Sequence, residues 1–311
     1  MSYELEFEEP VRHLDAELSR VQRSGANEER VRTLESEIDA QLVEIYGRLN
    51  PWETVQVARH HDRPYTLDFV KLIFSDFIEL HGDRRFGDDR AILGGPALLH
   101  GIGVMVIGNQ KGRDTKGNVD HNFGMPNPEG YRKAIRLFHQ AEKLGLPVIT
   151  LVDTPGANPS LPAEERGQAQ AIAESIAAML SLRTPTIAVI TGEGGSGGAL
   201  GIAVADRLLM LEHSIFTVAS PEAAASILWR DSAQAPAAAA SMKIRARDLV
   251  ELGIVDGIIP EPAGGAHRDH VATARNLREA IETHLGELRA YDVDELVRRR
   301  QEKYRRIGAV A

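Results

Sequence analysis

The sequence of 311 residues contains no cysteine, and this absence excludes several kinds of chemistry. Without a thiol the chain can form no disulfide and can offer no cysteine nucleophile. It also supplies no ligand to a cysteine-bound zinc or iron–sulfur site. The lack of cysteine is compatible with a reducing cytoplasm, where we expect this protein to act.

Long apolar runs are missing as well. No stretch of about 18 apolar residues, the length that indicates a membrane-spanning helix, occurs in the sequence. The first ten residues are acidic and include no hydrophobic segment of the kind found in secretory leaders. We therefore expect neither a membrane span nor secretion.

The chain has no excess of positive charge with which to bind a polyanion. Its net charge of −9 disfavours general binding of nucleic acids. One segment is basic nonetheless, "RRRQEKYRR" at residues 298–306, and we expect it to be a solvated helix end. The 43% of hydrophobic residues is typical of a globular protein with a substantial core.

The N-terminal region has the pattern of a helical hairpin. Apolar residues recur at helical spacing from Val11 to Tyr46, with an interruption at "RSGANEE" that predicts two antiparallel helices. A connector at residues 50–66 then leads to a predicted helix at residues 67–80. We assign residues 1–63 to an N-terminal helical extension and residues 64–311 to one main domain.

The main domain alternates predicted strands and helices. Residues 97–110 predict a β-hairpin. Two nearly continuous apolar strands are predicted in "LPVITLVDTPG" and "TPTIAVITGEGG", and a predicted helix precedes each of them. Buried parallel strands joined by helices indicate the α/β class. The remaining predicted helices and strands complete this pattern: helices at 130–144, 163–182, 269–288 and 294–307, and strands in "LLMLEH", "IFTVAS" and "IVDGIIPEP".

A glycine cluster follows the second of these strands, with five glycines in the seven residues from Gly192 to Gly198. It contains the G-x-G-x-x-G spacing of dinucleotide-binding proteins, and Glu212 lies twenty residues beyond Gly192, where such proteins bind a ribose. A turn of glycines at a helix N-terminus can equally direct backbone N–H groups at an oxyanion. Both interpretations place a ligand at the carboxyl ends of the strands.

Two features disfavour a nucleotide site. The glycines come late in the chain, after another α/β unit, whereas the dinucleotide motif usually opens its domain. No Lys-Ser or Lys-Thr follows them, which excludes a P-loop. Ser196 lies among the glycines, but no triad can be placed around it, so we do not expect a nucleophile.

Side chains that could act as acid, base or metal ligand are few. The groups His60-His61-Asp62 and His267–His270 lie in connectors, and we expect them in surface loops. Asp153 and Glu193 flank the two strand ends, where we expect them to bond the local backbone. The basic segment at residues 109–118 is compatible with binding an anion such as a CoA phosphate or with a mobile loop.

Four long motifs together resemble the carboxyltransferase alpha subunits of bacterial acetyl-CoA carboxylases, over nearly the whole chain. They are "NQKGRDTKGNVDHNFGMPNPEGYRKAIRL", "LVDTPGANPSLPAEERGQAQAIA", "TGEGGSGGALGIAVADRLLMLEHSIFTVASPEAAASILWR" and "IIPEPAGGAHRD". The resemblance implies a crotonase-like ββα spiral with an N-terminal helical hairpin and C-terminal helices. It favours the oxyanion interpretation of the glycine cluster.

The resemblance also implies an activity and its partners. Family members transfer a carboxyl group from carboxybiotin, held on a separate biotin carboxyl carrier protein, to acetyl-CoA, and so make malonyl-CoA for fatty acid synthesis. They work with a beta subunit, expected as an α2β2 assembly, and with biotin carboxylase. Zinc is expected only in the beta subunit, and no cofactor is expected to be bound by this chain, in agreement with its lack of cysteine.

The resemblance assigns site residues by position. Stabilisation of the biotin oxyanion is expected from Gly194, Gly195, Gly197 and Gly198. A lesser contribution to the carboxybiotin pocket is expected from Gly156 and Ala157. We expect valine at position 195 or 198 to leave the fold intact and suppress the reaction. Departures from the usual family sequence occur at Asn109, Asn158, Ser160 and Ala223.

Two alternatives stay open on the sequence. A self-sufficient hydratase or isomerase of the crotonase fold would need carboxylates placed in its pocket. A nucleotide-binding module would use Glu212 to hold a ribose.

Overall fold

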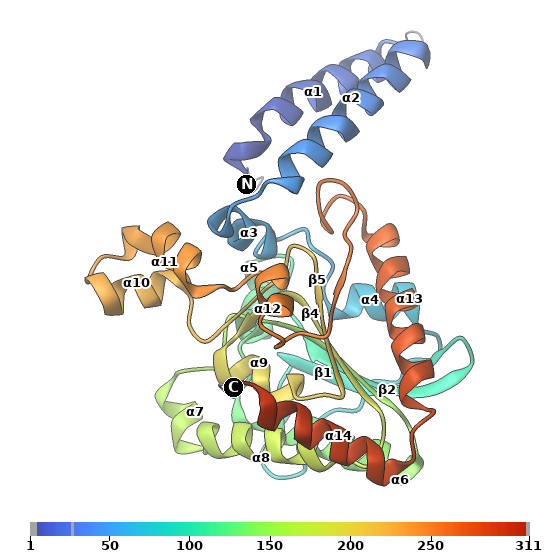
Figure 1. Ribbon diagram of the computed structural model, residues 1–311, viewed down its shortest axis with the longest axis vertical. Helices are drawn as coiled ribbons and strands as arrows, with labels where there is room; N and C mark the ends of the chain where they lie inside the picture. Colours follow the sequence, from blue (N-terminus) through green and yellow to red (C-terminus); the bar gives the residue numbers. More distant parts are fainter. Residues whose placement is uncertain (1–4, 26–27, 309–311) are drawn as a thin grey trace.

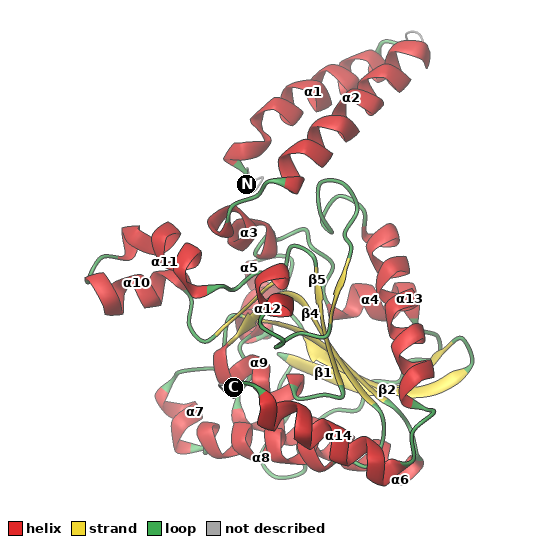
Figure 2. Ribbon diagram, in the orientation of Figure 1, coloured by secondary structure: helices red, strands yellow, loops and turns green. Residues whose placement is uncertain are grey.

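A seven-stranded sheet organises the computed structural model, which describes residues 5–25 and 28–308 (Figures 1 and 2). Its strands run in the order β1-β2-β3-β4-β5-β7, and β6 pairs with β4 outside this path. The strands are β1 (Ile92–Leu99), β2 (Ile102–Asn109), β3 (Val148–Thr154), β4 (Thr186–Gly195), β5 (Arg207–Leu211), β6 (Ile215–Thr217) and β7 (Gly257–Ile259).

The strand β4 changes partner along its length. Its first half, Ile187–Ile190, pairs in parallel with β5, and its last residues, Glu193–Gly195, pair in parallel with β6. On its other side β4 pairs with β3, and the register shifts between Val152 and Thr154. The carboxyl end of β4, which carries the glycines, therefore lies between β3 and β6.

Helices connect and cover the strands. The first group is α1 (Glu9–Arg23), α2 (Glu28–Gly47), α3 (Pro51–Ala58), α4 (Thr66–Ile73), α5 (Thr115–Asp120), α6 (Pro128–Leu144), α7 (Leu161–Glu165) and α8 (Gln168–Ser181). The second is α9 (Ser196–Ala203), α10 (Pro221–Trp229), α11 (Ala235–Met242), α12 (Ala246–Glu251), α13 (His270–Leu288) and α14 (Val293–Arg306). Three short 3₁₀ turns lie at Glu6–Glu8, Asn122–Gly124 and Ser232–Gln234.

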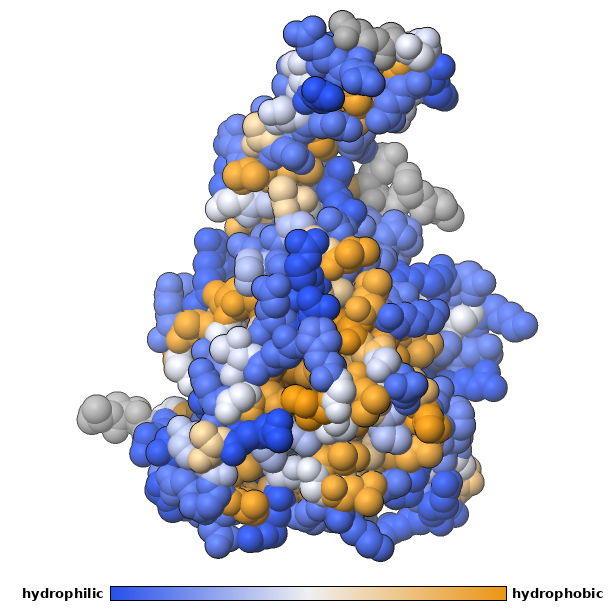
Figure 3. All heavy atoms as spheres, turned by 90° about the vertical axis from the view of Figure 1, so that its right-hand side faces the viewer, coloured by the Kyte–Doolittle hydropathy of each residue, from blue (hydrophilic) through white to orange (hydrophobic). Residues whose placement is uncertain are grey.

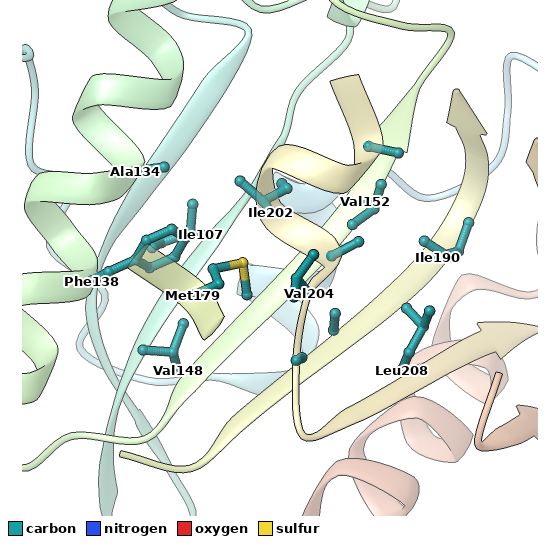
Figure 4. Close-up of a cluster of buried hydrophobic side chains, with 14 of the residues drawn as sticks. Ile107, Ala134, Phe138, Val148, Val152, Met179, Ile190, Ile202, Val204 and Leu208 are labelled. Atoms are coloured by element: carbon teal, nitrogen blue, oxygen red, sulfur yellow. The ribbon is translucent and has the colours of Figure 1, made fainter. Parts of the chain in front are cut away.

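Alternation along the strands divides the core into two layers. Met105 and Ile107 belong to one buried cluster with α6, α8 and α9, whereas Val104 and Val106 belong to another with α4 and α13. Figure 4 shows side chains of the first layer meeting between helices and strands. Since both faces of the sheet are covered, the strands are apolar at nearly every position, as expected for buried parallel strands. The predicted α/β class is confirmed.

The predicted N-terminal hairpin is confirmed as α1 and α2, which project from the body (Figure 1). Its apolar stripe forms a small cluster of its own around Ile38 and Leu42. At its base Tyr46 donates a hydrogen bond to Glu8, and Arg268 pairs with the same carboxylate at 3.2 Å. The hairpin surface is mostly polar, whereas the side of the body that carries α4 and α13 also exposes apolar residues (Figure 3).

Three predicted segments differ in the structure. The helix expected at 67–80 ends at Ile73, because residues 75–80 pair with β1 instead: Ile78 N–H donates to Pro96 O at 3.0 Å and Leu80 N–H to Gly94 O at 2.9 Å. The helix expected at 163–182 is divided into α7 and α8 at Gly167, which has a φ of +82°. The expected connector contains α3.

The basic segment near the C-terminus belongs to α14, and its centre is not solvated as expected. Arg300 is 1% exposed and pairs with Asp206. Arg298 and Arg299, by contrast, keep half of their side-chain surface exposed. Among the helices that the structure describes, none is long and apolar enough to cross a membrane.

Candidate active site at the carboxyl ends of two strands

The turns that follow β3 and β4 are in direct contact. Thr154 pairs with Gly194 at the ends of the two strands. A β-carbon at Gly195 would lie 2.1 Å from Pro155 O, and one at Gly198 would lie 2.4 Å from Ala157 N. Such distances leave no room for a side chain, which explains glycine at both positions. The expectation that valine at 195 or 198 leaves the fold intact is wrong for the same reason.

The sequence suggests that the glycine cluster forms a single turn, but in the structure it does not. Gly192 to Gly195 are the last residues of β4, and the chain turns only at Ser196, which begins α9 with a φ of +51°. In a dinucleotide site the first glycine of the motif makes the turn. Here Gly192 is in the strand, where a β-carbon would lie 2.6 Å from Asp153 Oδ1. The geometry therefore contradicts the nucleotide interpretation.

The N-terminus of α9 has the properties of an anion site. The first N–H groups of an α-helix have no partner within the helix and carry its positive dipole end. No side chain among the described residues caps α9. Its amides are therefore available to a ligand.

A cavity of about 500 Å³ lies in front of this helix end. Ser196 and Gly197 form part of its wall, and most of the rest is apolar, contributed by Leu200, Phe216, Val218, Ile244, Leu249 and Ile254. None of the described lining residues is an aspartate or a glutamate. An apolar cavity of this size with a few polar groups at one end is typical of a small-molecule site.

The predicted site residues meet at this corner but face different ways. Of the four glycines assigned to the oxyanion site, Gly197 lines the cavity, and a β-carbon there would meet only Ile172, at 3.7 Å. Gly198 faces the neighbouring turn, and Gly194 and Gly195 pair with β6.

The two residues of the lesser assignment, Gly156 and Ala157, lie in that neighbouring turn. The Gly156 N–H already donates to Thr154 Oγ1 at 3.1 Å. The catalytic role of all six residues stays a prediction.

A buried ionic network lies behind the glycines. Lys111 Nζ is 2.6 Å from Asp153 Oδ1 and 3.8 Å from Glu193 Oε2, and Arg59 Nε is 2.7 Å from Glu193 Oε1. Arg59 also pairs with Glu222 at 2.5 Å. Burial alone would lower the pKa of Lys111, but the carboxylates of Asp153 and Glu193 outweigh it and raise that pKa. Asp153 and Glu193 are thus held in ion pairs with Lys111 and Arg59, and they are not free to act as an acid or a base.

The same network answers two questions that the sequence left open. Asp153 Oδ1 accepts a hydrogen bond from the Glu193 N–H at 2.9 Å, as expected for a strand-end carboxylate. In the basic segment at 109–118, the first two cations already have partners within the protein. Lys111 faces the network, and Arg113 pairs with Asp68 and lies 3.9 Å over the ring of Tyr65.

One histidine of each group, His60 and His267, is more buried than expected, whereas His61 keeps 43% of its side chain exposed. His60 is 8% exposed, and its ring stacks on that of His267 at 4.0 Å. The ligand atoms of His60, His61 and Asp62 lie within 4.8 Å of one another. However, the rings of His60 and His61 stack with an interplanar angle of 26°, and the Asp62 N–H donates to His60 Nδ1. Stacked rings do not direct two nitrogens at one ion, so we assign no metal here.

The residue proposed for a ribose is engaged elsewhere. Glu212 Oε2 accepts a hydrogen bond from the Glu261 N–H at 3.1 Å. Glu261 in turn pairs with Arg63 at 2.7 Å, and Arg63 donates to Thr191 O at 2.9 Å. Glu212 thus helps to hold the middle of β4 and does not face the glycine corner.

The four departures from the usual family sequence are tolerated by the fold. Ala223 lies inside α10, where no positive φ is needed. Asn158 Nδ2 donates to Asn127 Oδ1 at 2.8 Å, and the Ser160 N–H donates to Asn158 Oδ1. Asn109 Oδ1 accepts from the Asp153 N–H, and its Nδ2 is buried without a hydrogen-bond partner in the described chain.

No sequence pattern singles out Arg59 or the apolar lining of the cavity, and Lys111 stands out only as part of the basic segment at 109–118. Arg59 meets Glu193 across 134 residues of chain, and no local pattern reveals such a pair. For Ser196 the sequence suggests no role other than that of a nucleophile. Its signal was its position among glycines, the one residue with a side chain between Gly194 and Gly198.

Comparison with known sequences gives a consistent result. A family model described as acetyl co-enzyme A carboxylase carboxyltransferase-like matches residues 4–308. A protein of Geobacter metallireducens is 54% identical over an alignment of 313 positions, which covers 99% of this chain and 98% of the relative. One from Listeria monocytogenes is 49% identical over the same shares. Both are named acetyl-coenzyme A carboxylase carboxyl transferase subunit alpha.

Solved structures agree at the level of the fold. Transcarboxylase 12S, crystallised with methylmalonyl-coenzyme A, superimposes with a TM-score of 0.57 at 20% identity, over 71% of this chain and 41% of that chain. A Pseudomonas malonate decarboxylase hetero-tetramer with coenzyme A gives 0.56 at 20% identity, over 65% and 82%. These neighbours confirm the predicted crotonase-like fold.

Proposed function

This chain belongs to the family of acetyl-CoA carboxylase carboxyltransferase alpha subunits, and we propose that its glycine corner stabilises negative charge on the biotin ring during carboxyl transfer. The chain is accordingly the alpha subunit of a biotin-dependent carboxyltransferase that makes malonyl-CoA for fatty acid synthesis. The observation that carries the proposal is the uncapped N-terminus of α9 beside the cavity.

The chemistry requires a place for negative charge. Carboxybiotin supplies the carboxyl group: its N–C bond breaks, the ureido nitrogen takes the proton that leaves the acetyl methyl group, and a new C–C bond gives malonyl-CoA. Negative charge grows on the ureido oxygen while the N–C bond breaks. Backbone N–H groups that are already oriented stabilise such charge, and removal of one donor costs about 2.7–4 kcal/mol in known cases.

The chain meets this requirement without a side-chain base. The amides at the start of α9 point along the helix axis and add the positive end of the helix dipole. The apolar side chains that line the cavity lower the local dielectric constant, which strengthens the interaction of the amides with a developing charge. Among the glycines, Gly197 is the one that lines the cavity, so we assign it the central position. Gly195 and Gly198 keep the neighbouring turn in contact with this corner.

The alternative of a self-sufficient hydratase or isomerase fits the site less well. Such an enzyme needs acid or base groups in its pocket. The described residues that line the cavity include no carboxylate, and Asp153 and Glu193 are paired with Lys111 and Arg59.

Partner subunits follow from membership of the family, since the relatives are named as one subunit of a carboxyl transferase. In the proposal the second substrate, acetyl-CoA, is bound by a beta subunit that also holds the zinc. Carboxybiotin arrives on the biotin carboxyl carrier protein, which biotin carboxylase reloads. An α2β2 assembly, a cytoplasmic location and the division of the chain at residue 63 are further parts of the proposal.

The test is Gly197→Ala in the assembled enzyme, assayed by malonyl-CoA-dependent carboxylation of biocytin. A β-carbon at 197 has room, with Ile172 at 3.7 Å, and alanine favours a helix over glycine. The variant should therefore fold, while it adds a methyl group to the residue that carries the central amide at the cavity. We expect kcat to fall by at least about tenfold.

Gly286→Ala is the matched control, because Gly286 lies in α13 with no atom within 4 Å of an added β-carbon. It should leave kcat unchanged. Normal turnover of a folded Gly197→Ala enzyme would contradict the proposed function.

A further inference from the structure

Two of the polar residues that line the cavity have an uncommon backbone conformation. Ser196 and Lys243 have φ values of +51° and +54°. In this left-handed region every residue except glycine is strained, and asparagine or aspartate tolerates it best. Strain of this kind persists where the surrounding structure enforces it, and it gathers at functional sites.

The fold does not require serine at position 196. Its neighbours on both sides are glycines, and glycine at 196 would adopt the same backbone at lower cost. The side chain is exposed to the cavity, and its hydroxyl makes no hydrogen bond with any residue in the described part of the chain. What serine adds over glycine here is therefore a hydroxyl group beside the amides of α9.

The ligand has a hydrogen-bonding need that amides cannot meet. The ureido ring of biotin has an oxygen that accepts and, next to it, a second nitrogen that is not carboxylated and carries a hydrogen. Backbone N–H groups only donate, so the oxygen can bind them but the ring N–H cannot. A donor that is buried without an acceptor costs free energy. The ring therefore needs an oxygen next to the amides.

The cavity offers two side-chain oxygens for this purpose. Thr217 also lines it, but its hydroxyl donates to Ala219 O at 2.7 Å and is held by that bond. Lys243 has only donors. The hydroxyl of Ser196 is free to rotate and belongs to the residue that opens α9, so it is adjacent to the Gly197 amide along the chain.

We propose that Ser196 is a substrate-contacting residue that accepts a hydrogen bond from the uncarboxylated ureido N–H and so fixes which nitrogen of the ring faces acetyl-CoA. This inference rests on the proposed function, because it assumes biotin in the cavity. With the oxygen bound to amides and one nitrogen bound to Ser196, the other nitrogen is the one presented for carboxyl transfer.

The test compares Ser196→Gly with the unaltered assembled enzyme on two substrates. One is biocytin, and the other is biocytin methylated at the ureido nitrogen that is not carboxylated. Loss of one neutral hydrogen bond should raise the KM for biocytin about fivefold. The methylated compound cannot donate, so its KM should be the same or lower in the variant. The KM for malonyl-CoA should not change.

Control variants separate the hydroxyl from the backbone. Arg230→Gly relieves another left-handed residue, with a φ of +58° at the end of α10 and outside the cavity, and should leave every constant unchanged. The Tm of Ser196→Gly should be no lower than that of the unaltered protein, because glycine suits this backbone.

Three results would overturn the assignment. They are an unchanged KM for biocytin, an equal increase for both compounds, and a larger increase in Thr217→Val than in Ser196→Gly. Failure of the proposed function looks different, since biocytin would then not be a substrate or Gly197→Ala would be fully active.

Discussion

The two ends of strand β4 satisfy their backbone groups in opposite ways. At the amino end, Asp206 Oδ2 accepts from both the N–H and the hydroxyl of Thr186 at 2.8 Å, and Arg300 pairs with the same carboxylate at 2.7 Å. At the carboxyl end, the chain passes through glycines into α9, whose first amides have no side-chain cap among the described residues.

The difference separates stability from function within one strand. Arg300 also donates to the carbonyl oxygens of Met179, Leu182 and Thr184, at 2.7–3.0 Å. Such a saturated group leaves nothing for a ligand to bind. The open amides at the other end are a cost to the empty protein that a ligand can offset. A change at the amino end should therefore alter folding, and a change at the carboxyl end should alter catalysis.

The largest effect is expected from Arg300→Met. The substitution removes the partner of Asp206, whose side chain is only 3% exposed. Breaking a buried ion pair on one side typically costs about 3–5 kcal/mol, and urea unfolding of the full chain should show a loss of this size. The kcat of the fraction that remains folded should not change. A loss of turnover in fully folded protein would mean that the two ends are coupled.

Gly198→Ala should have the next largest effect, and it should affect both folding and catalysis. The added β-carbon would lie 2.4 Å from Ala157 N and 2.4 Å from Gly156 C, which are backbone atoms that cannot yield easily. Overpacking of this kind typically costs about 1–3 kcal/mol. We expect a lower Tm together with a lower rate of biocytin carboxylation. Gly197→Ala is the contrast, because it should lower only the rate.

The sequence was sufficient for the strands but not for the partners of the glycines. Apolar runs revealed β3 and β4, and the glycine cluster revealed the corner where they end. The cluster could not show that Gly192 and Gly194 belong to the strand, because glycine is compatible with a strand, a turn or a helix start. Contacts with other segments, such as those of Gly195 with Pro155 and of Gly198 with Ala157, distinguish the tightly packed glycines from Gly197 at the cavity.

Contacts between residues far apart in the sequence could not be predicted from local sequence patterns. Residues 75–80 continue the predicted helix, but several of their backbone groups find partners on the edge strand β1, and this contact overrides the local preference. Arg63 and Glu261 are 198 positions apart and meet behind β4. Such pairs depend on topology, which periodicity does not encode.

A smaller effect is expected from Glu261, which pairs with Arg63 and through it holds Thr191 in the middle of β4. Burial alone would raise the pKa of this carboxyl, but Arg63 and the His213 N–H lower it to about 2. The unfolded chain, with an ordinary pKa near 4.5, therefore binds more protons at acid pH. Linkage then requires that stability falls as the pH drops from about 4.5 toward 2.

The measurement for Glu261 is the free energy of unfolding against pH for the unaltered chain and for Glu261→Gln. The variant is less stable at neutral pH, because it leaves Arg63 buried without its partner. Its curve should nevertheless be flatter below about pH 4.5, since glutamine does not titrate. Parallel curves in this range would show that other carboxyls carry the acid sensitivity.

The smallest effect is expected two positions before Arg300, at Arg298. This side chain also forms ion pairs, at 2.7 Å with Glu295 and 2.5 Å with Glu302, but it is 54% exposed on α14. Water screens such a pair and the side chains lose conformational freedom in forming it, so exposed pairs add little stability. We expect Arg298→Ala to change the Tm by no more than about 1 °C, in low and in high salt alike. If Arg298→Ala destabilised the chain as much as Arg300→Met, the stability of the amino end of β4 would come from the charge of α14 as a whole and not from one saturated arginine.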